Sequence, residues 1–300
     1  MNTTTATATA TTALPAAAPA ERSRGYWGNV GARVLRDPGF WVASALVLTL
    51  LAMALFGPWI APADPQTSSM LSRLKPIGTE GHPLGTDELG RDMLSRLIVG
   101  ARLSLFMGIT PVILAFVIGS AIGILAGYAG GITNTAIMRT IDVFYAFPSV
   151  LLAIALSGAL GAGIGNALLS LTIVFIPPIA RVAESVTTQV RGRDYVEAAR
   201  ASGAGAFTIV RVHVLGNVLG PIFVYATSLI AVSMILASGL SFLGLGVKPP
   251  EPEWGLMLNT LRTAIYVQPW VAALPGVMIF ITSIAFNLLS DALRAAMDNK

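Results

Sequence analysis

The chain has no cysteine and few charged residues. Charged residues make up 11% of its 300 residues and hydrophobic residues 54%, whereas about a quarter of the residues of a typical soluble domain are charged. The lack of cysteine excludes a disulfide framework, a thiolate metal site and a cysteine nucleophile. With a mean hydropathy of +0.73, the chain is predicted to be an integral membrane protein.

Familiar catalytic patterns are missing as well. The sequence has no phosphate-binding glycine loop ending in Lys and Ser or Thr, no histidine pair at metal spacing and no serine in a nucleophile elbow. His82 and His213 lie far apart, so we expect packed or hydrogen-bonded side chains rather than nickel ligands. We therefore predict that the chain is not an enzyme and that it binds neither a cofactor nor a metal. Its energy is expected to come from a separate component.

Long runs without charge indicate the transmembrane segments. A bilayer crossing needs about 20 mostly apolar residues, and the gaps between charges supply six candidates: 40–60, 103–128, 141–157, 167–180, 217–238 and 271–289. We expect a Gly/Asn turn at 129–135, before the third candidate. The predicted fold is an all-α membrane domain over residues 37–300 with six transmembrane helices. Prolines inside these segments are predicted to kink them: Pro111, Pro148, Pro177, Pro178, Pro221 and Pro275.

The distribution of Lys and Arg predicts which side each loop faces. With the N-terminus inside, the inner loops hold more Lys and Arg than the outer loops, as is usual for membrane proteins. Both termini are therefore predicted to be cytoplasmic. Residues 1–36 are expected to form a largely disordered cytoplasmic tail, because the chain begins with a low-complexity run of Ala and Thr. Arg139 and Asp142, three residues apart, could form a local ion pair with a structural role.

A polar segment interrupts the apolar runs at residues 191–215, with the sequence RGRDYVEAARASGAGAFTIVRVHVL. It is predicted to form two short helices separated at Gly203 and Gly205. Asp194 can cap the first helix, and Glu197 stands in its first turn, where unpaired N–H groups favour a carboxylate. The alanines that follow leave little side chain on this helix, so a partner surface could approach its backbone closely.

This segment resembles the EAA signature of bacterial ABC importer permeases. In that family the signature forms a cytoplasmic coupling helix that docks into a groove on the ATPase. Taken alone, Glu197 is more typical of a solvated helix position. The resemblance of the surrounding residues to the family favours the coupling role. This resemblance implies that the following residues take part in coupling the permease to the ATPase: Asp194, Glu197, Ala198, Ala199, Arg200, Gly203 and His213.

The resemblance covers about residues 40–298. The segment HPLGTDELGRDMLSRLIVGARLSL at 82–105 is similar to the one before the second span in permeases for dipeptides, oligopeptides and nickel. SFLGLG at 241–246, followed by Glu253 and Trp254, looks like the loop before the last span in the same family. These motifs indicate the C-type permease, which is the second of the two permease types in such a system.

Two positions depart from the family pattern. A Leu-Pro pair usually ends the second coupling helix, but here Leu215 is followed by Gly216. Because glycine also ends helices, we expect the helix to stop there, with a looser link to the fifth span. An acidic residue commonly precedes SFLGLG, but here residues 236–240 read LASGL, so no role of that carboxylate carries over.

The resemblance also implies partners and a cargo. It implies ATPase subunits, a second homologous permease that completes a heterodimeric pore, an extracytoplasmic solute-binding protein and the lipid of a bacterial inner membrane, without nucleic acid. Dipeptides or oligopeptides are the expected solutes, with nickel or a glutathione-like compound as the alternative. An ion-coupled secondary transporter would need ionisable residues buried within its spans, whereas Asp142 and Asp291 are expected at span ends. A membrane-embedded hydrolase would need clustered catalytic groups, and none cluster in the sequence.

Overall fold

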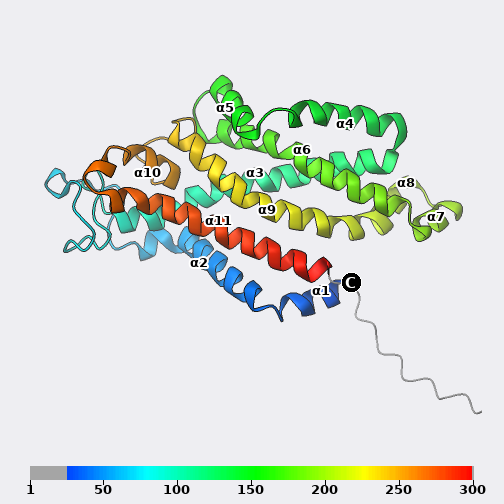
Figure 1. Ribbon diagram of the computed structural model, residues 1–300, viewed down its shortest axis with the longest axis horizontal. Helices are drawn as coiled ribbons and strands as arrows, with labels where there is room; N and C mark the ends of the chain where they lie inside the picture. Colours follow the sequence, from blue (N-terminus) through cyan, green and yellow to red (C-terminus); the bar gives the residue numbers. More distant parts are fainter. Residues whose placement is uncertain (1–25, 299–300) are drawn as a thin grey trace, which may run out of the picture.

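The computed structural model describes residues 26–298, and this part of the chain is an elongated bundle of helices (Figure 1). In chain order the α-helices are α1 (Tyr26–Val34), α2 (Pro38–Ile60), α3 (Met93–Ala129), α4 (Gly131–Tyr145), α5 (Ser149–Leu160), α6 (Ile164–Arg191), α7 (Asp194–Ala201), α8 (Ala206–Ile209), α9 (Leu215–Phe242), α10 (Trp254–Thr260) and α11 (Pro269–Asp298). Between α8 and α9 lies a π-helical turn, Val210–Val214.

Within residues 26–298, five stretches of helix are long and apolar enough to cross a membrane, and a bent pair of helices, α4 and α5, provides a sixth crossing if it is counted as one. The chain bends by 84° between α4 and α5, so residues 141–157 belong to two helices rather than one, and the bend lies at Pro148, where the sequence predicted a kink. Pro148 is the N-cap of α5. Because proline lacks an N–H and disfavours helical backbone at the residue before it, it favours a helix break at this point. The turn expected at 129–135 is shorter than predicted: α3 ends at Ala129 and α4 already begins at Gly131, so only Gly130, with a φ of 66°, separates the two helices.

The predicted tail contains one helix. The first 25 residues lie outside the described part of the chain, whereas Tyr26–Val34 forms α1. Val34 packs against Ala296 near the end of α11, so the beginning and the end of the described chain lie side by side (Figure 1). Asp37 then caps α2 by accepting a hydrogen bond from the N–H of Gly39 at 2.8 Å.

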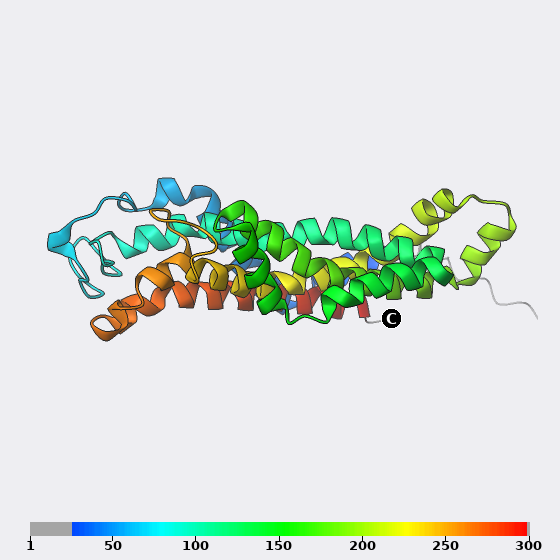
Figure 2. The same ribbon diagram turned by 90° about the horizontal axis from the view of Figure 1, so that it is seen from above.

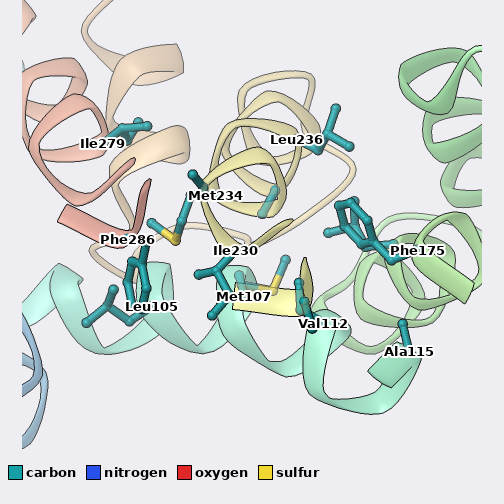
Figure 3. Close-up of a cluster of buried hydrophobic side chains, with 14 of the residues drawn as sticks. Leu105, Met107, Val112, Ala115, Phe175, Ile230, Met234, Leu236, Ile279 and Phe286 are labelled. Atoms are coloured by element: carbon teal, nitrogen blue, oxygen red, sulfur yellow. The ribbon is translucent and has the colours of Figure 1, made fainter. Parts of the chain in front are cut away.

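The core of the bundle lies between α3, α6, α9 and α11. Because lipid tails are as apolar as leucine, close packing rather than removal from water must hold these helices together. The sulfur of Met234 on α9 occupies the space that a Cβ at Gly108 of α3 would need. Figure 3 shows the buried side chains that interlock here: Leu105, Met107, Val112, Ala115, Phe175, Ile230, Met234, Leu236, Ile279 and Phe286.

Glycines bring α3 and α6 into direct backbone contact. Gly119, Gly123 and Gly127 recur every four residues and therefore share one face of α3. A Cβ at Gly127 would lie 2.7 Å from the carbonyl oxygen of Glu184, and one at Gly123 would overlap the carbonyl oxygen of Ala180. This spacing of small residues is the usual means by which membrane helices approach closely. It positions α6, which connects the polar insert to the rest of the bundle.

One end of the bundle, which we call the loop end, carries the folded segments 61–92 and 243–268 (Figure 2). Asp87 is buried there and accepts hydrogen bonds from the backbone N–H groups of Leu89 and Arg91, both at 2.9 Å, and from Nε of Arg91 at 2.6 Å. Nε of Arg96 lies 3.4 Å from the same carboxylate. These interactions tie the long loop to the start of α3.

The start of α3 is fixed by a second buried carboxylate at the loop end. Asp92 is the N-cap of α3, and its Oδ2 accepts hydrogen bonds from the backbone N–H of Ser95 at 2.8 Å and from its hydroxyl at 2.7 Å. The other oxygen lies 3.0 Å from Nδ1 of His82. His82 is thus a hydrogen-bonded part of the loop end.

A third buried carboxylate joins α10 to α3. Glu253 is 1% exposed and caps α10, accepting hydrogen bonds from the N–H groups of Gly255 at 2.9 Å and Leu256 at 2.8 Å. Ser104 of α3 donates to the same carboxylate at 3.3 Å and accepts from the N–H of Trp254 at 2.9 Å. Burial raises the pKa of the Glu253 carboxyl, while the backbone and hydroxyl donors around it act in the opposite direction.

Candidate functional site: the polar insert and the broken span

The polar insert forms the end of the bundle opposite the loop end (Figures 1 and 2), and we call it the insert end. It consists of α7, α8 and the π-helical turn Val210–Val214. Val196 of α7 is 0% exposed and belongs to the main apolar core together with Ile209. Together with Val214, which is also 0% exposed, these residues anchor the insert to the core.

Gly203 shapes the turn that separates the two helical parts of the insert. The N–H of Ala204 bonds to the carbonyl of Ala199 at 3.1 Å, and the N–H of Gly203 bonds to the carbonyl of Arg200 at 3.0 Å. Gly203 has a φ of 82°, which glycine adopts without a steric penalty. This Schellman arrangement satisfies the last carbonyls of α7 and reverses the chain toward α8.

Most of the residues assigned to coupling lie exposed on α7. Asp194, Glu197, Ala198 and Arg200 are exposed, whereas Ala199 is half-buried and packs against the core. Asp194 does not cap the helix, as the sequence suggested. It is the first helical residue, and the N-cap position belongs to Arg193, which makes no capping side-chain hydrogen bond. The carboxylates of α7 nevertheless stand in its first turn, where the N-terminal N–H groups favour them.

His213 connects the two halves of the insert. Its ring centroid lies 6.2 Å from that of Tyr195 on α7, with the two planes tilted by 46°. Tyr195, Phe207 and Val212 are large apolar side chains that remain 44%, 79% and 62% exposed. Sequence reasoning did not select these three residues, although an aromatic or apolar residue inside a polar insert was the available signal. An exposed apolar group rimmed by charges is typical of a protein interface.

The second half of the insert does not end at Gly216. Helix runs without a break from Ala206 to Phe242, and Gly216 is the second residue of α9 with a φ outside the left-handed region. The N–H of Leu215 bonds to the carbonyl of Val210, as in a π-helix. Asn217 adds a side-chain hydrogen bond to the carbonyl of His213 at 2.7 Å. The expected helix stop at Gly216 is therefore wrong, because a π-helical turn carries the chain directly into α9.

A cavity opens on the face formed by α4, α5, α6 and α9, with a volume of about 300 Å³. Aromatic side chains dominate its wall, and the double proline of α6 forms part of it. In α5 only Ala153 and Ser157 are buried. In the described chain, one side of this broken span therefore packs on the bundle, and the other side of the span is open. The residues that line the cavity include Phe144, Tyr145, Phe147, Phe175, Pro177, Pro178 and Tyr225.

Beside this cavity Asp142 pairs with a residue that the sequence did not suggest. Nη2 of Arg181 on α6 donates a hydrogen bond to Oδ1 of Asp142, whereas Arg139 lies exposed on α4. The expected local pair between Arg139 and Asp142 is therefore not the one that forms. The guanidinium carbon of Arg181 also lies 5.1 Å from the centroid of the Tyr145 ring. The pair links α4 to α6 across 39 residues of sequence.

The chain matches two family descriptions. Residues 119–300 match the binding-protein-dependent transport system inner membrane component family, and residues 25–76 match the N-terminal TM domain of oligopeptide transport permease C. The chain belongs to the family of binding-protein-dependent transport system inner membrane components, and it is a membrane-embedded ABC importer permease. Within this family it is a permease of the C type.

Relatives named as transport permeases are similar to this chain over most of their length. The glutathione transport system permease protein GsiD of Pectobacterium atrosepticum is 41% identical over 274 residues, which cover 91% of each chain. The di/tripeptide transport system permease protein DppC of Pseudomonas aeruginosa is 42% identical over 259 residues, covering 85% of this chain and 86% of the relative.

The fold is also found in a solved structure. A chain of the MetNI methionine ABC transporter in an inward facing conformation aligns with a TM-score of 0.56 and 23% identity. The alignment covers 68% of this chain and 97% of the MetNI chain. At this level of identity the likeness concerns the type I importer permease fold alone.

Proposed function

We propose that this permease couples ATP hydrolysis to solute import through the exposed face of α7, which binds a separate ATPase subunit. The observation that carries the proposal is the exposure of Glu197, Ala198 and Arg200 on a helix that is anchored to the bundle core by Val196. Such a helix is open to a partner and is also held firmly enough to transmit movement. The adjoining apolar groups Tyr195 and Phe207 extend the same surface.

The direction of the molecule in the membrane follows from this proposal. The insert end faces the cytoplasm with the ATPase, and the loop end faces the opposite side, where a solute-binding protein delivers its cargo. The excess of Lys and Arg in the loops on the insert side supports this orientation. A second homologous permease covers the open face of α4, α5, α6 and α9, and the two chains together form a heterodimeric pore. Both chain ends then lie on the cytoplasmic side.

The proposed solutes are short peptides. The two relatives of 41% and 42% identity are named for glutathione and for di- and tripeptides, and glutathione is itself a tripeptide. A nickel complex remains the second candidate within the family, but the described residues contain no group of three or more His, Asp or Glu side chains placed to hold a metal ion.

The test is a pair of substitutions on the exposed face of α7. Glu197→Lys reverses a charge and Ala198→Trp adds bulk, and both positions are exposed, so neither should disturb packing of the bundle. We expect normal membrane levels, loss of ATPase co-purification and at least about a tenfold fall in peptide uptake, equivalent to about 1.4 kcal/mol or more of lost interface energy.

The matched control is Glu80→Lys, which makes the same charge change at an exposed position of the loop end. It should leave ATPase co-purification intact. Wild-type uptake in both α7 variants would show that this face does not bind the ATPase.

A further inference from the structure

The ion pair between Arg181 and Asp142 lies on a membrane helix surface that the chain itself leaves open. The side chains of Arg181 and Asp142 remain 47% and 34% exposed. Charged side chains within membrane-spanning segments face a bundle interior or a water-filled cavity rather than lipid. The face that carries the pair therefore borders water or a protein partner, and the adjoining aromatic cavity belongs to the same surface.

Arg181 is placed directly beside the cavity. It follows the cavity-lining Pro178 by three residues on α6, and residues at this spacing share one helix face. Tyr145 both lines the cavity and lies under the Arg181 guanidinium, 5.1 Å from ring centroid to the guanidinium carbon. A second groove of about 370 Å³ adjoins Arg181 on its other side, together with Glu184 and Met138. Arg181 thus stands between the aromatic cavity and a groove that follows α6 toward the insert end.

In this ion pair another carboxylate can replace that of Asp142, so the pair is suited to partner exchange rather than to holding α4 and α6 together permanently. A half-exposed pair contributes little to stability because water competes for both partners. The guanidinium carries five donors in a planar fork that matches a carboxylate, and the hydrogen bond found to Asp142 uses Nη2. The cation–π contact with Tyr145 holds the guanidinium beside the cavity wall. A second carboxylate could therefore replace Asp142 without rearrangement of the helices.

We propose that Arg181 is a transit site for the carboxylate group of the transported solute, which displaces Asp142 from the guanidinium as the solute leaves the aromatic cavity. Asp142 competes with the solute carboxylate for the guanidinium and restores the pair once the solute has passed. The proposal rests on the proposed function, because short peptides carry a free carboxylate at their C-terminus. Arg181 is then a specificity-determining residue within the pathway.

The test compares substitutions at both partners in the complete transporter, reconstituted with its ATPase, its second permease and its binding protein. The probe is radiolabelled trialanine with a free carboxylate. Arg181→Gln should lower trialanine uptake about tenfold or more, as for the loss of one charge-assisted hydrogen bond, while trialanine-stimulated ATP hydrolysis continues. Arg181→Lys keeps the charge but loses the fork, and should give an intermediate rate. Asp142→Asn removes the competing carboxylate and should raise the initial uptake rate.

A purely structural ion pair predicts a different pattern. Arg181→Gln and Asp142→Asn would then lower uptake equally, and the double variant would recover; either this pattern or wild-type uptake in Arg181→Gln overturns the proposal. Arg139→Gln removes an exposed positive charge from the same helix as Asp142 and should transport like the wild type. A wild-type complex whose ATP hydrolysis does not respond to any short peptide would instead overturn the proposed function, and the transit site with it.

Discussion

Glu253 shows how one residue connects the loop end to the spans. Its carboxylate caps α10 and also accepts a hydrogen bond from Ser104 of α3, while the neighbouring Trp254 donates from its indole N–H to the carbonyl of Leu97 at 3.0 Å. A buried carboxylate is stable only with such donors around it. Movement of the loop end must therefore be transmitted to α3 at this point.

The raised pKa of Glu253 leads to a prediction about pH and stability. Because burial favours the protonated carboxyl in the folded state, this residue stabilises the fold most at low pH. Its contribution is lost as the pH rises from the ordinary value of 4.5 through the raised folded pKa. Glu253→Gln stays neutral, so the stability advantage of the wild type over this variant should shrink as the pH rises.

Thermal unfolding of the detergent-solubilised protein across this pH range measures the difference. At low pH the variant should be less stable by about 0.5–2 kcal/mol, the usual effect of a weakened helix cap. Glu80→Gln, at an exposed position of the same end, is the control and should follow the wild type at every pH. A difference between Glu253→Gln and the wild type that grows with pH would contradict the assignment.

At the scale of elements, the shape of the insert depends on the backbone conformation at two glycines. Gly203 reverses it with a φ of 82°, whereas Gly216 lies within continuous helix. A Cβ at either position would meet no other atom within 4 Å. The two glycines therefore differ in backbone conformation and not in packing, which makes them a matched pair.

Alanine substitutions at the two glycines should act in opposite directions. Gly203→Ala should destabilise the turn after α7 by about 1–2 kcal/mol, because a Cβ is unfavourable in the left-handed region. Gly216→Ala should stabilise the start of α9 by about 0.5–1 kcal/mol, the usual gain of alanine over glycine inside a helix. Amide hydrogen exchange over residues 194–220 measures both effects. Equal protection of these amides in the two variants would show that the π-helical turn does not continue into α9.

At the scale of the whole molecule, the bundle has a covered side and an open side. Helix α3 is covered by α2, α6 and α9, and α9 packs on α11, whereas α4 and α5 border an open aromatic cavity. The loop end and the insert end are separated by the length of the bundle (Figures 1 and 2). The proposed ATPase, solute-binding protein and second permease therefore each meet a separate surface: the insert end, the loop end and the open side.

The proposed orientation gives a prediction at this scale. A reporter inserted after Gly192 at the insert end should report the cytoplasm, and one inserted after Glu251 at the loop end should report the outside. Alkaline phosphatase and green fluorescent protein fusions, which are active on opposite sides of the membrane, provide the measurement. An outside signal at Gly192 would exclude coupling to a cytoplasmic ATPase through α7.

Local sequence patterns were sufficient to predict the class of protein and most of its helices. Long apolar runs without charge have few alternatives to membrane helices, because every backbone polar group in lipid must be satisfied within the segment. The insert was equally visible, since a charged run such as residues 191–200 stands out against that background. The turn at Gly203 followed from the conformational freedom of glycine, which is also a local property.

Features that depend on residues far apart in the chain were decided only by the tertiary structure. Asp142 pairs with Arg181 instead of Arg139, because the approach of α4 to α6 brings a cation 39 residues away within reach. The continuous helix through Gly216 likewise depends on how neighbouring helices pack, since glycine is compatible both with a helix end and with a helix interior. Side-chain chemistry and hydrophobic pattern are local and can be read along the chain. The partner of a charge and the path of a kinked helix depend on three-dimensional contacts, which the linear pattern does not contain.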